Sequence, residues 1–323
     1  MRGVGDASRR GIDNALANWP LVLIRIAENV LIILVVLATL FGALLPVFAG
    51  GLGLATLGEL SENPDAMAEA IAEGILGMSP VLIVYVVALV SLAMLVGVLV
   101  HAFVQAGVIG CYVGAERAAP AAAASRRDFR WFTPERWWGE AKRFGWRFFW
   151  IYNIVWGAYS LVLLIPILPL FLMLVVFRES PGAIVLTCLG AVLITLFAIV
   201  LALVVFVWSQ VALIECVATD AGLAEAMRRG RAAFRGRTGT IVLIAIIFFA
   251  VSSAVGSVIA GFSIGIDMAS AVPGFDIAFL PVRIVLSLLN TAVAALVGAW
   301  LLAALVAAVV PRPETPHAAA AGV

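Results

Sequence analysis

The sequence predicts an all-α integral membrane protein, a bundle of six transmembrane helices with amphipathic helices at its cytoplasmic surface. Of the 323 residues, 64% are hydrophobic and 12% are charged, whereas a soluble domain carries about 25% charge. Six apolar runs are long enough to cross roughly 30 Å of hydrocarbon as helices. We therefore expect one membrane domain over residues 1–310, followed by a flexible cytoplasmic tail at 311–323 that has no structural signal.

The six apolar runs define the expected spans, near residues 21–48, 80–107, 148–176, 182–210, 240–263 and 280–309. The first run is too long for the core of a signal peptide, and no cleavage pattern follows it, so we expect it to be retained. Cys111, Cys188 and Cys216 lie in or beside these runs without the spacing of a disulfide or metal framework. They are expected to be packing residues.

The distribution of basic residues predicts the orientation, because cytoplasmic loops keep Lys and Arg. Of the 20 Lys and Arg residues, only Arg178 and Arg283 fall on the side opposite to the N-terminus. Both termini are therefore expected in the cytoplasm, with the chain in a bacterial plasma (inner) membrane. The net charge of +1 hides this asymmetry.

Three segments, at residues 6–19, 134–148 and 220–237, place apolar residues at helical spacing opposite basic ones. Thr133 and Pro134 have the residue types that start a helix, as N-cap and first residue. A helix of this kind lies among lipid headgroups, with its basic face toward anionic lipid; an ordinary solvated loop helix is the alternative for the third segment. The basic residues expected to face lipid or a partner are Arg136, Arg143, Arg147, Arg228, Arg231 and Arg235.

Two of these segments give expectations for single residues. In the first, Arg10 belongs to the polar face, opposite Ile12 and Leu16. The third is expected to begin near Asp220, where a carboxylate suits the helix dipole, and to turn an apolar face that includes Met227 toward the acyl chains.

Tryptophans gather in the stretch that leads into the third span: Trp131, Trp137, Trp138, Trp146 and Trp150. Amphipathic rings of this type form belts at the membrane–water interface, which is our interpretation. An aromatic cage for a ligand is the alternative.

Two short segments suggest an internal repeat. Ile109-Gly110-Cys111 and Ile214-Glu215-Cys216 stand at corresponding positions where the second and fourth spans leave the membrane. Each is followed by a basic amphipathic segment and another span, as the N-terminal segment is. The simplest description is three tandem units, each a surface helix followed by a transmembrane hairpin.

Polar side chains in or near the spans fall at one level, close to the expected cytoplasmic boundary. At this depth they are interpreted as a layer that ties helix ends together, because ionisable groups are costly only deep in hydrocarbon. A gate for a substrate or ion is the alternative. The residues are Arg25, Glu28, Asn29, His101, Gln105, Asn153, Gln210 and Glu215.

The sequence predicts neither a catalytic site nor a metal or cofactor site. The residues 261–265, GFSIG, match G-x-S-x-G, but that motif needs a strand-to-helix elbow and a histidine within reach. His101 is expected at the other side of the membrane, and a haem or metal role for it is a further alternative. His317 is in the tail, so one chain offers no bis-histidine pair.

The stretch at residues 211–237 resembles a broad set of bacterial six-span membrane proteins of poorly defined function, including the membrane domain attached to some glycerophosphodiester phosphodiesterases. The residues that carry the resemblance are Glu215 at the end of a span, Gly222-Leu223, Ala226 and Arg228-Arg229. The resemblance implies a membrane-embedded accessory or scaffold role. The attached enzyme's activity is not implied, since the chain lacks its barrel and its metal-binding acids.

These observations predict a non-enzymatic membrane scaffold or accessory subunit that organises lipid or a partner membrane protein. The expected partners are anionic headgroups and a membrane protein or a second copy of the chain, with no nucleic acid. The alternative function is a transporter or permease component with a polar gate at its cytoplasmic side.

Overall fold

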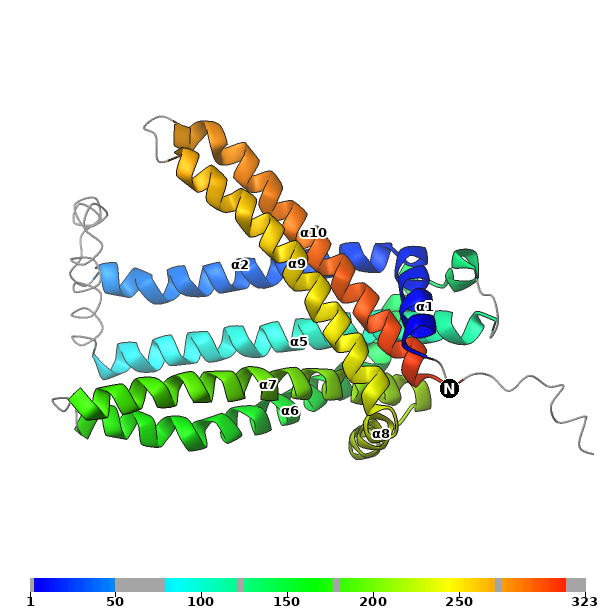
Figure 1. The fold of residues 1–323 in the computed structure, drawn as a ribbon, viewed down its shortest axis with the longest axis horizontal. Helices are drawn as coiled ribbons and strands as arrows, with labels where there is room; N and C mark the ends of the chain where they lie inside the picture. Colours follow the sequence, from blue (N-terminus) through cyan, green and yellow to red (C-terminus); the bar gives the residue numbers. More distant parts are fainter. Residues whose placement is uncertain (1–2, 50–78, 121–124, 177–180, 271–274, 312–323) are drawn as a thin grey trace, which may run out of the picture. The chain divides into compact units, whose positions relative to one another are not determined.

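The protein is helical throughout the residues that the computed structural model describes, which are 3–49, 79–120, 125–176, 181–270 and 275–311 (Figure 1). This part of the chain holds eight α-helices, a 3₁₀ helix at Arg126–Phe129 (η1), and no strand. The α-helices are α1 (Val4–Ala17), α2 (Pro20–Ala49), α5 (Pro80–Ala118), α6 (Pro134–Val176), α7 (Pro181–Thr219), α8 (Leu223–Gly236), α9 (Thr238–Ser270) and α10 (Phe275–Val309). The expected tail at 311–323 lies almost wholly outside the described residues.

Six of these helices are long and apolar enough to cross a membrane, as the sequence predicts. The candidate spans are Pro20–Ala43, Pro80–Ala118, Pro134–Leu170, Val185–Thr219, Thr238–Ile266 and Pro281–Val309. Large apolar side chains such as Phe41, Ile165 and Phe262 are exposed along them. In water such surfaces would be an aggregation liability, whereas lipid solvates them. The chain is a multi-pass helical membrane protein.

Proline starts four of the long helices, α2, α5, α6 and α7, because its fixed φ suits the first turn and its missing N–H is not needed there. The expected start of α6 is confirmed: Thr133 Oγ1 accepts a hydrogen bond from the backbone N–H of Arg136 at 3.3 Å. Ser79 Oγ caps α5 in the same way, accepting from the N–H of Leu82 at 3.3 Å.

α6 differs from the expectation in one respect, since the surface segment and the third span form a single helix of 43 residues. At 1.5 Å per residue it is roughly 65 Å long, about twice the hydrocarbon thickness. Nothing between Pro134 and Pro166 breaks it, and it continues through Pro166 and Pro169. α5 and α7 likewise run beyond the expected ends of their spans, to Ala118 and Thr219. The last turns of α5 and α7 therefore extend beyond the apolar runs, where they can contact other helices.

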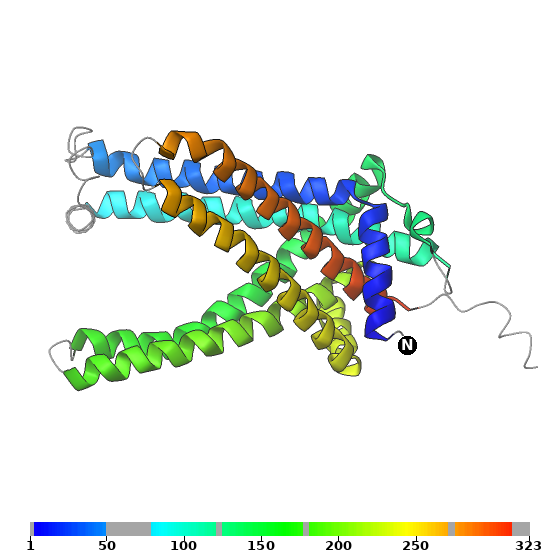
Figure 2. The same ribbon diagram turned by 45° about the horizontal axis from the view of Figure 1, so that its top comes forward.

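The contacts divide the chain into two compact units, one at Ala27–His101 and the other at Met1–Ile26 with Ala102–Val323. In the first unit, α2 and α5 meet where the Tyr85 hydroxyl donates to the carbonyl oxygen of Gly42 at 3.4 Å. In the second, α6 lies beside α7 and α9 beside α10, as both ribbon views show (Figures 1 and 2). One membrane domain over residues 1–310 stays a prediction.

The buried side chains of the second unit gather where α5, α7 and α10 end and where α6 and α9 begin. Tyr112, Phe148, Ile214, Ile241 and Leu305 are among its fully buried residues. We call this region, together with α1, η1, α8 and the first turns of α2, the basic end. It positions all the polar contacts of the second unit that are described below.

Candidate functional site: the basic end of the spans

α1 packs directly on the last turns of α10. A Cβ atom placed on Gly11 would lie 2.5 Å from the backbone nitrogen of Ala304, so only glycine permits this approach. The indole N–H of Trp300 donates to the carbonyl oxygen of Ser8 at 3.0 Å. The N-terminal segment is thus joined to the other end of the chain, a contact that the sequence pattern does not reveal.

Arg10 is buried, where the sequence placed it on the polar face of α1. Its Nε donates to Oε1 of Glu116 at 2.9 Å, and only 5% of Arg10 and 2% of Glu116 is exposed. Its Nη1 donates to the carbonyl oxygen of Pro120 at 3.0 Å, and its guanidinium stacks over Phe129, 4.9 Å from the ring centroid. Helical periodicity could not show this pair, because Glu116 is supplied by the extended end of α5.

Asn14 of α1 and Asn18, the C-cap residue of α1, complete a polar connection to the chain before α6. Asn18 Nδ2 donates to the carbonyl oxygen of Phe129 at 2.7 Å, and its Oδ1 accepts from the N–H groups of Trp131 and Phe132 at 3.0 and 2.9 Å. Asn14 Nδ2 donates to the carbonyl oxygen of Tyr112 at 3.2 Å. Both asparagines are fully buried, so their hydrogen bonds replace those that water would make.

α8 packs on α7 as α1 packs on α10. Ala226 and Gly230 are buried, and a Cβ atom on Gly230 would lie 2.6 Å from Cα of Ala212. The small residues of the expected apolar face therefore meet protein instead of acyl chains, and Met227 is half-buried. Close packing on α7 needs small residues at the contact, whereas the sequence pattern marks only which face is apolar.

The turn between α7 and α8 is fixed by Asp220. The expected start of α8 near Asp220 is wrong by a few residues, since the helix begins at Leu223. Asp220 has a φ of 50°, and the N–H of Ala221 donates to the carbonyl oxygen of Cys216 at 3.1 Å. This left-handed residue with a 6→1 hydrogen bond is the Schellman ending of α7.

The carboxylate of Asp220 holds two arginines of α6. Arg143 Nη2 donates to Oδ2 at 2.6 Å and Arg147 Nη1 donates to Oδ1 at 2.8 Å. The hydrogen bond from Arg143, followed by that from Arg147, lowers the pKa of the Asp220 carboxyl. The helix-dipole role expected for Asp220 is replaced by this cross-link between α6 and the α7–α8 turn.

Replacing Asp220 with asparagine should lower the melting temperature at neutral pH, since asparagine tolerates the left-handed backbone but loses both ion pairs. A carboxyl whose pKa is depressed by folding stabilises the fold above its unfolded pKa, near 4, and this stability disappears as the pH falls through the folded pKa. The difference in melting temperature between wild type and Asp220→Asn should therefore shrink below about pH 4. A difference that stays constant down to pH 2 would contradict the assignment.

The eight residues of the expected polar layer form pairs and single sites in the structure. Within the first unit, Nδ1 of His101 lies 2.5 Å from Oε1 of Glu28, whose side chain is 1% exposed. Within the second, Gln105 Nε2 donates to Oε1 of Gln210 at 2.8 Å. Asn153 Nδ2 donates to the carbonyl oxygen of Phe149 on its own helix at 2.7 Å. Of the rest, Arg25 and Glu215 are half-buried and Asn29 is exposed.

The Gln105–Gln210 bond should contribute modestly to stability. Hydrogen bonds between membrane helices are worth about 0.6 kcal/mol on average and up to about 1.7 kcal/mol in double-mutant cycles. We expect a coupling free energy of about 1 kcal/mol in a cycle of Gln105→Leu, Gln210→Leu and the double variant, measured by unfolding in detergent. A coupling of zero would show that the two amides do not interact.

Most of the expected basic residues make contacts within the protein, although Arg136, Arg143 and Arg228 remain exposed. Arg136 donates to the carbonyl oxygen of Trp131 at 3.0 Å and stacks on its ring at 4.3 Å. Arg228 pairs with Glu225 at 2.5 Å, while Arg231 and Arg235 are exposed. Arg143 and Arg147 are bound to Asp220. The members of this set that are most available to lipid or a partner are therefore Arg231 and Arg235 on α8.

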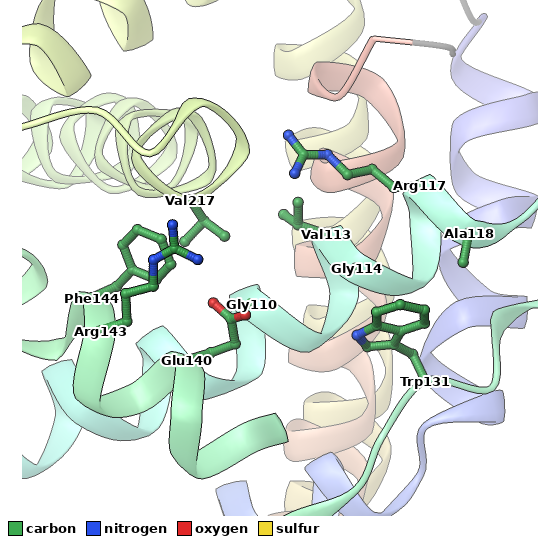
Figure 3. A pocket seen from close by; sticks show the side chains of 10 residues that line it. All are labelled: Gly110, Val113, Gly114, Arg117, Ala118, Trp131, Glu140, Arg143, Phe144 and Val217. Atoms are coloured by element: carbon green, nitrogen blue, oxygen red, sulfur yellow. The ribbon is translucent and has the colours of Figure 1, made fainter. Parts of the chain in front are cut away.

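A cavity of about 390 Å³ opens between the ends of α5 and α7 and the start of α6 (Figure 3). Arg117, Trp131, Glu140 and Arg143 line it. A Cβ atom on Gly110 would lie 2.5 Å from Cβ of Glu140, and one on Gly114 would meet the Trp131 indole. The two glycines thus make room for Glu140 and Trp131 in the cavity wall.

The sequence pattern does not predict this cavity, although it contains one indication of a close helix contact there. Gly110 and Gly114 form a G-x-x-x-G pattern, which marks a helix face that another element approaches closely. That pattern predicts the contact but not the residues that make it. Among the described residues, no group of three His, Cys, Asp or Glu side chains is placed to hold a metal ion.

Comparison of the chain with protein-family models, curated proteins and solved structures found no match. The resemblance at residues 211–237 therefore stays a prediction.

Proposed function

We propose that the protein is a non-enzymatic integral membrane scaffold or accessory subunit, whose basic end organises phospholipid headgroups or a partner membrane protein. The observation that supports this most is the concentration of polar cross-links between helices at the basic end, of which Arg10–Glu116 and Gln105–Gln210 are buried. Arg10–Glu116, Gln105–Gln210 and the Asp220 pairs join helices there. Such cross-links hold helix ends in fixed positions, which suits a platform more than a moving gate.

A repeated arrangement of these contacts supports the proposal of three tandem units. α1 meets α10 at Gly11 and Ala304, α8 meets α7 at Gly230 and Ala212, and the start of α6 meets α5 at Trp137 and Gly107. Each surface segment therefore packs on the last helix of a hairpin, and the first packs on the last hairpin of the chain. A small residue stands on at least one side of every contact, as close helix approach requires.

Sequence positions that the contacts bring into register also support the repeat. Arg9-Arg10-Gly11 corresponds to Arg228-Arg229-Gly230. Gln105 and Cys111 correspond to Gln210 and Cys216 in the same way, six residues apart in each case, and the two glutamines bond to each other. A contact between equivalent positions is what two facing copies of one unit would make, so it supports the proposed repeat.

Solute flux tests the scaffold proposal. The purified protein, reconstituted in liposomes that contain a pH-sensitive dye and a potassium gradient, should give no proton or potassium flux above protein-free liposomes. If the wild type gives such a flux and Glu28→Ala or Glu215→Ala abolishes it, the scaffold role is overturned. Partners are sought separately by affinity purification from native membranes, with Arg231→Glu/Arg235→Glu as the variant expected to lose a partner bound to α8.

The same experiment tests transport as the second candidate function. The observation in its favour is the contact between His101 and the buried Glu28 within one helical hairpin. Ionisable residues inside transmembrane segments commonly mark proton or ion pathways. Proton flux lost in both Glu28→Gln and His101→Gln would support a transporter.

We further propose a bacterial inner-membrane location with both termini in the cytoplasm, on the basis of the basic residues at one side. In a variant without Cys188, the exposed native cysteine, a cysteine at Ala70 should react from outside with an impermeant maleimide and one at Ala232 should not. The opposite labelling pattern would reverse the orientation.

A further inference from the structure

The cavity at the basic end is lined by side chains with charges of both signs. Arg117 and Arg143 supply two guanidinium groups and Glu140 supplies a carboxylate. Figure 3 shows these side chains and Trp131 arranged around one space. Within the described part of the chain, no hydrogen bond or ion pair engages the Glu140 carboxylate.

The two arginines are held in place but keep donors available. Arg117 donates through Nη2 to the carbonyl oxygen of Ala218 at the end of α7. Arg143 donates through Nη2 to Asp220. Each guanidinium has five N–H groups in a fixed fork, so each retains donors for a ligand in the cavity. A phosphate, like a carboxylate, can accept two parallel hydrogen bonds from this fork.

The charge around the cavity does not favour a polyanion. Asp220 already offsets the charge of Arg143, and the Glu140 carboxylate would repel further negative charge. A primary ammonium, in contrast, would donate hydrogen bonds to Glu140 while a phosphodiester accepts from Arg117 and Arg143. A trimethylammonium has no N–H to donate, so it would make a weaker contact.

The tryptophans of α6 favour a position at headgroup depth for the cavity. Trp138, Trp146 and Trp150 are exposed on α6, and rings of this type mark the membrane–water interface. Glu140 and Arg143 fall between Trp138 and Trp146 along the same helix, a stretch of roughly 12 Å. A ligand in the cavity would therefore have its phosphate at the level of lipid phosphates.

We infer that this cavity binds the headgroup of a phospholipid that bears a phosphodiester and a primary ammonium, that is, a phosphoethanolamine headgroup. Arg117 and Arg143 bind the phosphate, Glu140 binds the ammonium, and Trp131 forms the wall beside them. The volume of about 390 Å³ lies within the range of small-molecule sites. This inference rests on the proposed membrane scaffold and names the lipid that it organises.

Native mass spectrometry of the purified full-length protein tests the inference. The protein in detergent is mixed with equal amounts of phosphatidylethanolamine, phosphatidylcholine and phosphatidylglycerol that have the same acyl chains. The wild type should retain phosphatidylethanolamine about tenfold better than the other two, the factor expected for one charge-assisted hydrogen bond. Equal retention of all three lipids would overturn the inference, whatever the variants do.

Variants separate the two halves of the headgroup. Glu140→Gln should remove the preference for phosphatidylethanolamine over phosphatidylglycerol, whereas Arg117→Gln should reduce retention of all three lipids by a similar factor. Glu135→Gln and Lys142→Gln alter exposed charges of the same helix outside the cavity and should leave the preference unchanged. Loss of the preference in these controls as well would show a general surface-charge effect and contradict the site.

A competition experiment distinguishes lipid from a soluble ligand. Free O-phosphoethanolamine should displace the lipid only weakly, because it lacks acyl chains; displacement at equal concentration would assign the cavity to a soluble molecule and overturn the lipid source. The flux assay reports on the scaffold separately. If all three lipids are retained equally and the protein gives no flux, only the headgroup site is contradicted. If the protein prefers phosphatidylethanolamine but also gives a flux that depends on Glu28, only the scaffold is contradicted.

Discussion

Glu116→Ala should destabilise the folded protein by about 3–5 kcal/mol, the loss typical of a buried ion pair that is deprived of one partner. The variant leaves the guanidinium of Arg10 buried beside Phe129 with its main acceptor removed. The free energy of unfolding, measured by reversible denaturation in mixtures of detergent and SDS, should show this decrease.

The neighbouring arginine provides the matched control. Arg9 is exposed on the same helix, so Arg9→Ala should change the free energy of unfolding by no more than about 0.5 kcal/mol. The double variant Arg10→Met/Glu116→Leu removes both charges and should recover most of the stability that Glu116→Ala loses. If Glu116→Ala and Arg9→Ala have equal effects, the ion pair does not anchor α1.

Gly11→Ala should lower the free energy of unfolding by about 1–3 kcal/mol, because a methyl group there overpacks the contact with α10. The atoms that it would meet are the backbone nitrogen and Cα of Ala304, at 2.5 and 2.6 Å. A flexible side chain could turn away from the methyl group, but backbone atoms move only with their helix. Unfolding in detergent measures the loss.

Gly5→Ala is the control, with an expected effect of opposite sign. Gly5 lies in α1 with no atom within 4 Å of its Cβ position. Alanine there should stabilise the helix by about 0.5–1 kcal/mol, since it loses less backbone entropy than glycine. Two alanines six residues apart on one helix should thus shift stability in opposite directions, and a stabilising Gly11→Ala would contradict the packing of α1 on α10.

The sequence was most informative about the spans, because membrane crossing depends on local composition. A helix in lipid satisfies its own backbone, so an apolar run of sufficient length determines both its type and its approximate ends. The start of α6 at Thr133 and Pro134 could be predicted for a similar reason, since a helix cap involves only neighbouring residues. The six helices and this cap are confirmed.

The candidate site could be predicted much less well, because its contacts join residues far apart in the chain. Arg10 looks solvent-facing on α1 until the end of α5 brings Glu116 beside it. Asp220 looks like a helix-start residue until α6 places Arg143 and Arg147 within reach. Periodicity reports which face of a helix differs from the other, but it does not report whether lipid, water or a second helix covers that face.

The contact between α1 and α10 has a consequence for biosynthesis. α1 is synthesised before α10, and the stretch of α10 that receives it, around Ala304, is made almost 300 residues later. Until that stretch has been made, Gly11 and the carbonyl group of Ser8 lack the partners on α10 that they have in the folded protein. α1 can dock in this position only after α10 has been made, so we expect nascent chains that stall before Trp300 to carry α1 undocked, with its packing face exposed.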